Sequence, residues 1–191
     1  MDEKHRNVRE MGSNSGNISL WKDFFKRRKS DREDMARVLK NTALFSGLSP
    51  LELKTLAQSV YQRVYEPGET IFHQNHRGFG MYVIARGSVA IRGRGRDGEY
   101  LITTLREGSF FGELALVEPE NIRTASAVAQ ERSILIGFFK PDLQEILERK
   151  PSMGVKILYQ LSAVLGRRLI ETTERVSEII SKGETRADQA A

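Results

Sequence analysis

Two charged residues near a glycine are the most informative chemical feature of this chain. Gly112 and Glu113 stand in the run Phe110-Phe111-Gly112-Glu113-Leu114-Ala115-Leu116, and Arg123-Thr124-Ala125 follows. Glycine has no Cβ and lets a backbone approach a ligand closely, and arginine presents a planar set of donors that matches phosphate oxygens. An ionised glutamate only accepts hydrogen bonds, so it suits a sugar hydroxyl and repels phosphate. The set predicts a site for a small ligand that carries both a phosphate and a ribose.

The neighbouring residues suit the wall of such a site. A short helix that begins here would point unpaired N–H groups at an anion. Ala115 and Ala125 are small enough for a pocket lined by backbone. The candidate site is therefore Gly112, Glu113, Leu114, Ala115, Arg123, Thr124 and Ala125.

This segment, residues 110–125, resembles the phosphate-binding cassette of the cyclic nucleotide-binding domain family. The family pattern is F-G-E-(L/I)-(A/G)-L, a short spacer and then R-(S/T/A)-A, and the nine residues between Glu113 and Arg123 equal the bacterial spacer. Ile122 departs from the pattern, because many members place Pro or a polar residue there. The resemblance implies that Arg123 and the cassette N–H groups bind the cyclic phosphate, and that Glu113 accepts from the 2′-hydroxyl. We name this segment the cassette.

The residues around the cassette predict a series of short strands separated by turns. The β-rich runs cover residues 61–65, 70–72, 81–85, 88–91, 100–103, 125–129 and 133–138. Residues 92–98 are expected to form a hairpin loop that ends in Asp-Gly. We expect a mainly β fold with flanking helices: an antiparallel, jelly-roll-like β-barrel with N-terminal helices and a long C-terminal helix.

Helix signals lie on both sides of the expected barrel. Ser49-Pro50-Leu51-Glu52 combines a capping Ser, an early Pro and a Glu three residues after the Ser. Pro141 opens a short helix, and Pro151 opens a much longer one that is expected to end at Lys182, before Gly183. The expected organisation is a flexible basic segment with a short amphipathic helix (1–29), a barrel with flanking helices (30–150), a long lid or dimerisation helix (151–183) and a disordered tail (184–191).

The expected long helix carries a second resemblance. Residues 166–176 are similar to the central helix of family regulators of the catabolite activator type, in which a hydroxyl pair from the two subunits of a dimer contacts adenine. Thr172 and Thr173 match that pair, so the resemblance adds them to the candidate binding residues. Two solvent-facing threonines are the plainer interpretation of the same residues.

An apolar stripe on this helix favours a homodimer. Leu165, Leu169, Thr172, Val176 and Ile179 follow steps of four and three along one face, as in a helix that pairs with its twin. Only about two heptads are covered, so the same stripe could instead pack on the chain's own barrel.

Composition excludes several classes of function. The 191 residues contain no cysteine, which excludes disulfides, zinc fingers and thiol catalysis. No Ser-His-Asp triad or Walker loop is present in the sequence, and the few residues after the long helix leave no room for a helix-turn-helix, so we expect neither an enzyme nor a nucleic-acid binder. No apolar run reaches membrane-spanning length and no signal peptide opens the chain, so we expect a cytoplasmic location.

The net charge of +5 comes mostly from the N-terminus, where residues 1–29 hold eight Lys or Arg against four acids. On a helix of residues 18–29, Trp21 and Phe24 would lie opposite Lys22 and Lys26. That pattern suits a protein surface, which we favour, or the inner face of a membrane, which makes a peripheral membrane adaptor the weakest functional alternative.

His73-Gln74-Asn75-His76 is the remaining cluster with chemical potential. Two histidines three residues apart need further ligands to hold a metal ion, and the third histidine of the chain lies far away at position 5. We therefore expect no metal.

The sequence predicts a stand-alone, non-enzymatic cyclic nucleotide sensor that passes binding through helix movement to a dimer interface or an unidentified protein effector. Thr172 and Thr173 favour cAMP as the regulatory ligand, whereas Thr124 resembles the hydroxyl that many cGMP-binding members use, so cGMP stays open. A barrel that serves as a protein-interaction or scaffold module without nucleotide is the alternative function.

Overall fold

The structure is a computed structural model that describes the backbone of residues 29–96 and 98–188. It describes the side chains of residues 34–96, 98–178 and 181. The amphipathic segment predicted before Lys29 lies outside the described residues.

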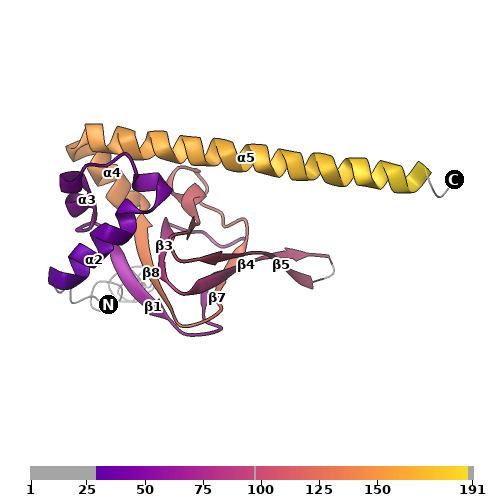
Figure 1. Ribbon diagram of the computed structural model, residues 1–191, viewed down its shortest axis with the longest axis horizontal. Coiled ribbons are helices and arrows are strands. Elements are labelled where there is room, and N and C mark those ends of the chain that lie inside the picture. Colours follow the sequence, from indigo (N-terminus) through magenta and orange to yellow (C-terminus); the bar gives the residue numbers. More distant parts are fainter. Residues whose placement is uncertain (1–28, 97, 189–191) are drawn as a thin grey trace, which may run out of the picture.

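Eight strands form two four-stranded antiparallel sheets, with the orders β1-β8-β3-β6 and β2-β7-β4-β5. Buried side chains from both sheets pack against one another to form the inside of a barrel. The predicted jelly-roll-like fold is therefore confirmed (Figure 1). The strands are β1 Tyr61–Tyr65, β2 Thr70–Phe72, β3 Gly80–Arg86, β4 Ser88–Gly95, β5 Gly98–Arg106, β6 Phe110–Phe111, β7 Ser126–Ala129 and β8 Ser133–Phe139.

The β4–β5 hairpin is longer than predicted, because the strands run to Gly95 and from Gly98 where a loop was expected. The ring of Tyr100 explains the extension. It covers Gly93 so closely that a Cβ there would lie 2.5 Å from the ring. An aromatic ring laid over a cross-strand glycine stabilises a strand that glycine alone would weaken.

The helices gather at one end of the barrel. They are α2 Lys29–Lys40, the 3₁₀ turn η1 Ala43–Phe45, α3 Pro50–Leu56, the 3₁₀ turn η2 Glu113–Leu116, α4 Lys140–Arg149 and α5 Pro151–Asp188. The capping box predicted for α3 is present: Glu52 N–H donates to Ser49 Oγ at 3.3 Å, and Ser49 N–H donates to Glu52 Oε2 at 2.7 Å. Lys156 Nζ also lies 2.9 Å from Glu52, so the cap links α3 to α5.

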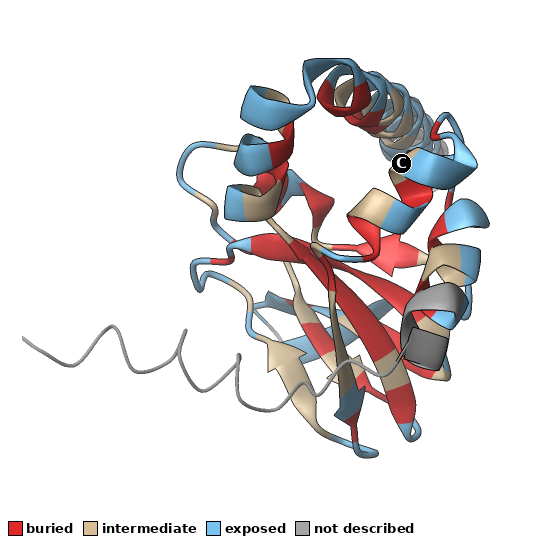
Figure 2. Cartoon of the chain, turned by 90° about the vertical axis from the view of Figure 1, so that its left-hand side faces the viewer, coloured by how far each residue is buried: buried red, intermediate tan, exposed pale blue. Residues whose placement is uncertain are grey.

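A second hydrophobic core lies between these helices and the sheet that contains β3 and β8. Phe45 meets Phe138 edge-on at 5.8 Å between ring centroids. Met153, Ile157 and Leu161 of α5 are buried in the same core. Figure 2 shows buried residues on the strands and on the helix faces that turn toward them.

The apolar packing of α5 on the rest of the chain ends at Leu165. Beyond Leu165, Leu169 and Val176 are exposed, and Figure 1 shows the helix extending well past the barrel. The described part of the stripe beyond Leu165 therefore does not pack on the chain's own barrel. The helix continues to Asp188, past the end expected at Lys182, because one glycine weakens a helix by only about 1 kcal/mol. Among the described helices, none has the length and apolar character needed to cross a membrane.

Candidate functional site

The cassette begins with a glycine-dependent turn. β6 leads into Gly112, whose φ of 76° lies in the left-handed region that glycine adopts without strain. A Cβ at this position would also lie 2.5 Å from Nη1 of Arg123. Both the turn and the space for the arginine therefore require glycine.

The turn leads directly into the short helix η2, as the sequence predicted. Ala115 N–H donates to Gly112 O at 3.2 Å, and Val117 N–H donates to Leu114 O at 3.1 Å. The N–H groups of Glu113 and Leu114, in the first turn, have no hydrogen-bond partner among the described residues. Such free N–H groups are the donors that an anion accepts from.

Arg123 is a buried cation held by carbonyl groups. The residue is 5% exposed, Nη1 donates to Gly112 O at 2.9 Å and Nη2 donates to Gly80 O at 2.7 Å. No carboxylate of the described residues lies within ion-pair distance of it, and its buried Nε has no hydrogen-bond partner there. Burial lowers the pKa of the Arg123 guanidinium, while Tyr82 and Glu113 oppose that shift.

A narrow slot fixes the plane of this guanidinium. The ring of Phe72 lies on one side, with its centroid 4.0 Å from the central carbon of Arg123. The backbone of Gly78 approaches so closely that a Cβ there would lie 2.1 Å from Nε. Neither residue was a candidate from the sequence, because both precede the arginine by more than 40 residues and only folding brings them to it.

Glu113 is the second buried charge of the site, and its side chain is 5% exposed. Its Oε1 accepts from Nη1 of Arg168 at 2.5 Å, whereas its Oε2 is buried without a partner among the described residues. Arg168 also donates to Phe110 O at 3.1 Å and lies 5.0 Å from the Phe110 ring centroid. This arginine of α5 therefore bridges the long helix and the cassette.

Sequence reasoning missed Arg168, although its position carried a signal. It lies one helical turn before Thr172, within the segment that resembles the central helix of family regulators. On a helix, residues four apart share a face, so a predicted ligand role for Thr172 placed Arg168 on the same side.

The other candidates lie in different places. Ala115 is buried, Ala125 is half-buried, and Leu114 and Thr124 are exposed. Thr172 and Thr173 are exposed on α5, where their hydroxyls donate to Arg168 O at 2.7 Å and to Leu169 O at 2.9 Å. The structure therefore unites Gly112, Glu113, Ala115 and Arg123, but it does not hydrogen-bond the threonine pair to the cassette within one chain.

The two histidines of the β2–β3 loop lie close together, with 5.3 Å between the ring centroids of His73 and His76. Within residues 34–96, 98–178 and 181, no three His, Asp or Glu side chains come close enough to hold a metal ion.

The double-sheeted barrel combines a glycine-led turn with a buried arginine and a buried glutamate, an arrangement that suits a small anionic ligand. Residues 62–150 match the family described as "Cyclic nucleotide-binding domain". Residues 62–150 belong to this family of regulatory domains, as the cassette residues suggested.

Known relatives agree with this assignment. The chain is 34% identical over 134 residues to the cyclic AMP receptor protein of Thermus thermophilus, covering 70% of this chain and 60% of that protein. It is 31% identical over 139 residues to cyclic nucleotide-gated channel beta-3 of the dog, covering 72% of this chain and 18% of the channel. The crystal structure of the Thermus thermophilus catabolite activator protein superposes with a TM-score of 0.65 at 32% identity, over 72% of this chain and 63% of that one. The chain thus spans less than two thirds of each of these proteins.

Proposed function

We propose that the chain is a non-enzymatic sensor that binds a cyclic nucleotide, cAMP in preference to cGMP, at the cassette. One observation carries the proposal: Arg123 is a buried cation without a carboxylate partner among the described residues. A buried charge is costly unless it is paired, so an anionic ligand is the missing partner that this arrangement favours.

Glu113 supplies the second half of the ligand's chemistry. Its unpartnered Oε2 is an acceptor held in a buried position beside the turn that binds Arg123. A ribose hydroxyl satisfies that oxygen, whereas a second phosphate oxygen is repelled. A cyclic nucleotide carries one phosphate and one free 2′-hydroxyl at a fixed spacing, which matches one cation and one acceptor.

Arg168 gives the site a path to the rest of the molecule. A ribose hydroxyl at Glu113 acts on the carboxylate that also holds α5, so ligand binding changes the strength of that contact. A ligand shifts a helix only by binding two arrangements of it unequally. We propose that the exposed part of α5 beyond Leu165 transmits this change to a second copy of the chain, or to a protein effector, in the cytoplasm.

The direct test is calorimetric titration of the chain with cAMP and cGMP. Arg123→Ala removes one partner of a buried charged contact, so its affinity should fall by about 2 to 5 kcal/mol, beyond detection for a micromolar ligand. Arg77→Ala is the matched control, since Arg77 pairs across the backbone with Ile122 beside the cassette but its side chain is exposed. Absence of binding to either nucleotide by the folded wild-type chain would contradict the proposal and favour the interaction module.

The role of Glu113 has its own test. Wild-type protein should bind cAMP at least tenfold more tightly than 2′-deoxy-cAMP, because only cAMP offers the hydroxyl. Glu113→Gln should reduce that ratio toward one. A ratio unchanged by the substitution would remove Glu113 from ribose recognition without affecting the role of Arg123.

A further inference from the structure

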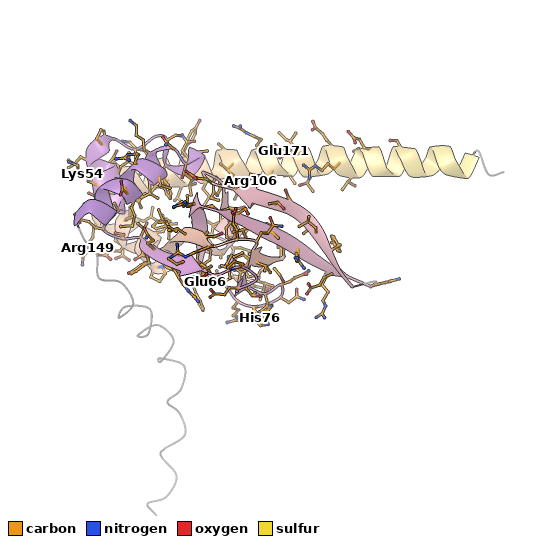
Figure 3. The ribbon with its side chains drawn as sticks, turned by 60° about the horizontal axis from the view of Figure 1, so that its bottom comes forward. Lys54, Glu66, His76, Arg106, Arg149 and Glu171 are labelled. Carbon is orange, nitrogen blue, oxygen red and sulfur yellow. The ribbon has the colours of Figure 1, made fainter. Side chains whose placement is uncertain are left out.

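A polar pocket opens on the barrel away from α5. It has a volume of about 260 Å³, and its walls are the loop His73–His76, the hairpin residues Gly93, Arg94 and Glu99, and Ser126 at the start of β7. Figure 3 shows His76 on the opposite side of the barrel from the helix that carries Glu171. The pocket is therefore separate from the Glu113–Arg168 contact.

The walls of this pocket are already fixed in place by hydrogen bonds. Gln74 N–H donates to Ser126 Oγ at 2.9 Å, and Gln74 Oε1 accepts from Arg94 N–H at 2.8 Å. Asn75 N–H donates to Arg123 O at 2.8 Å, and Arg123 N–H donates to His76 O at 2.9 Å. The β2–β3 loop thus joins β4 and β7 to the backbone of Arg123. A ligand therefore meets a preformed cavity.

The side chains that face the cavity are rich in donors that the chain does not use. The imidazoles of His73 and His76, the Asn75 amide and the Arg94 guanidinium have no hydrogen bond or ion pair to another described side chain. Each imidazole offers at least one N–H and the guanidinium offers five. Among the described lining residues, only Gly93 lacks a polar side chain, so the pocket favours a small, hydrophilic occupant over an apolar one.

The charges indicate an anion. Arg94 lines the pocket, and Arg92 lies on the same hairpin with Nη1 3.9 Å from Glu99 Oε2. Glu99 is the single described carboxylate of the lining, and Arg92 offsets its charge. A metal ion is disfavoured, because no three suitable ligands come together among the described side chains.

We propose that this pocket is a second ligand site, distinct from the cyclic nucleotide site, and that it binds a small phosphate-bearing anion. Arg94 donates to the phosphate oxygens as a planar fork, and the two imidazoles and the Ser126 hydroxyl complete the shell. Free phosphate and the phosphate of a small monoester share this chemistry. The site does not depend on the function proposed for the cassette.

Inorganic phosphate is the first probe, added to the full chain at constant ionic strength, with the backbone amide resonances of Gln74, Arg94 and Ser126 as local reporters. We expect saturable shifts, and Arg94→Gln should weaken the affinity by about tenfold or more. The backbone bond of Arg94 to Gln74 survives the substitution, so the fold is not at risk. Arg96→Gln is the matched control, because this exposed arginine of the same hairpin is not part of the lining.

Two further variants test where the ligand binds and whether its charge is negative. In Arg123→Gln, phosphate binding at the pocket should persist while cyclic nucleotide binding is lost, which separates the two sites. Glu99→Gln should tighten phosphate binding, because it removes the carboxylate that repels an anion. Three outcomes would each overturn the proposal. They are amide shifts that disappear in Arg123→Gln, phosphate binding that does not tighten in Glu99→Gln, and the lack of a saturable shift in the wild-type chain. Small phosphomonoesters such as glycerol phosphate then distinguish an ester ligand from the free ion.

Discussion

At the scale of single residues, the candidate site depends on how the Arg123 side chain is held in place. Arg123 gains its position from two carbonyl oxygens, one aromatic ring and two glycines, Gly78 and Gly112, that leave room for it. None of these partners carries a negative charge. The chain itself thus holds the guanidinium in place, but among the described residues no carboxylate supplies the counter-charge that a buried guanidinium needs.

Gly78→Ala should disturb this arrangement. Its Cβ would lie 2.1 Å from Nε of Arg123, so the guanidinium must leave the slot against Phe72. We expect cyclic nucleotide affinity to fall by at least tenfold and the free energy of unfolding to fall by about 1 to 3 kcal/mol, as in other overpacked sites. Calorimetry and urea unfolding measure the two effects.

Gly95→Ala is the matched control for that substitution, because its Cβ would make an ordinary contact at 3.5 Å with Tyr100. It should change neither quantity appreciably. If Gly78→Ala bound nucleotide like wild type, the slot would have no part in positioning Arg123.

At the scale of elements, α5 is one helix whose two parts have different surroundings. Its first half is held by a buried apolar face, whereas the described side chains after Leu165 are exposed apart from the half-buried Arg168. Regions with few buried contacts open most easily. Arg168 joins the part of α5 beyond Leu165 to the cassette. It is therefore the contact through which a change at the cassette would reach this part of the helix.

Arg168→Gln should loosen the outer half of α5. The substitution removes the ion pair with Glu113 and the bond to Phe110 O, so backbone amides of residues 166–178 should exchange with solvent several-fold faster. Arg167→Gln is the control, since this neighbouring side chain is exposed. Hydrogen exchange read by mass spectrometry checks the prediction, and equal exchange in both variants would show that the bridge does not hold the helix.

The exposed stripe of α5 is also where we propose that two copies meet. Leu169 is 68% exposed and Val176 is 50% exposed, and they lie seven residues apart on one face. Leu169→Asp should weaken self-association by at least tenfold in sedimentation equilibrium, because it places a charge in an apolar seam. Ile170→Asp is matched in exposure but lies off the stripe, so it should have the smaller effect. A wild-type chain that stays monomeric at high concentration would refute the seam.

At the scale of the whole molecule, the barrel interior contains buried hydroxyls in an aromatic core. Tyr65 is fully buried, and its hydroxyl has no hydrogen-bond partner among the described residues. Burial raises the pKa of Tyr65 and of Tyr82, because it disfavours the charged phenolate. The folded barrel therefore retains these two protons more tightly than the unfolded chain does.

This difference makes the two tyrosines contribute to the pH dependence of stability in alkali. Below the ordinary tyrosine pKa of about 10 both states are protonated and stability is fully present. As the pH rises above that value the unfolded chain ionises first, so stability is lost. At pH 8, Tyr65→Phe should unfold at a urea midpoint equal to or higher than that of wild type. Between pH 8 and pH 11, its midpoint should fall by less than the wild-type midpoint does. Tyr159→Phe, at an exposed tyrosine, is the control and should follow wild type.

Local chemistry let the sequence determine a good part of this protein. The α3 cap, the alternation of the strands and the glycine turn of the cassette depend on neighbours a few residues apart, so their residue types reveal them. Glu113 and Arg123 were predicted as site residues in the same way, because their spacing follows from one short segment. The end of α5 was misjudged, since a single glycine is a weak stop signal in a helix.

Only the tertiary structure decided what surrounds those two charges. Phe72 and Gly78 reach Arg123, and Arg168 reaches Glu113, across 45 to 55 residues of chain. The pocket beneath the hairpin likewise exists because β7 and the β2–β3 loop converge on β4. Contacts of this kind depend on how strands pair and how a helix is aimed, and residue types at short range carry no record of either.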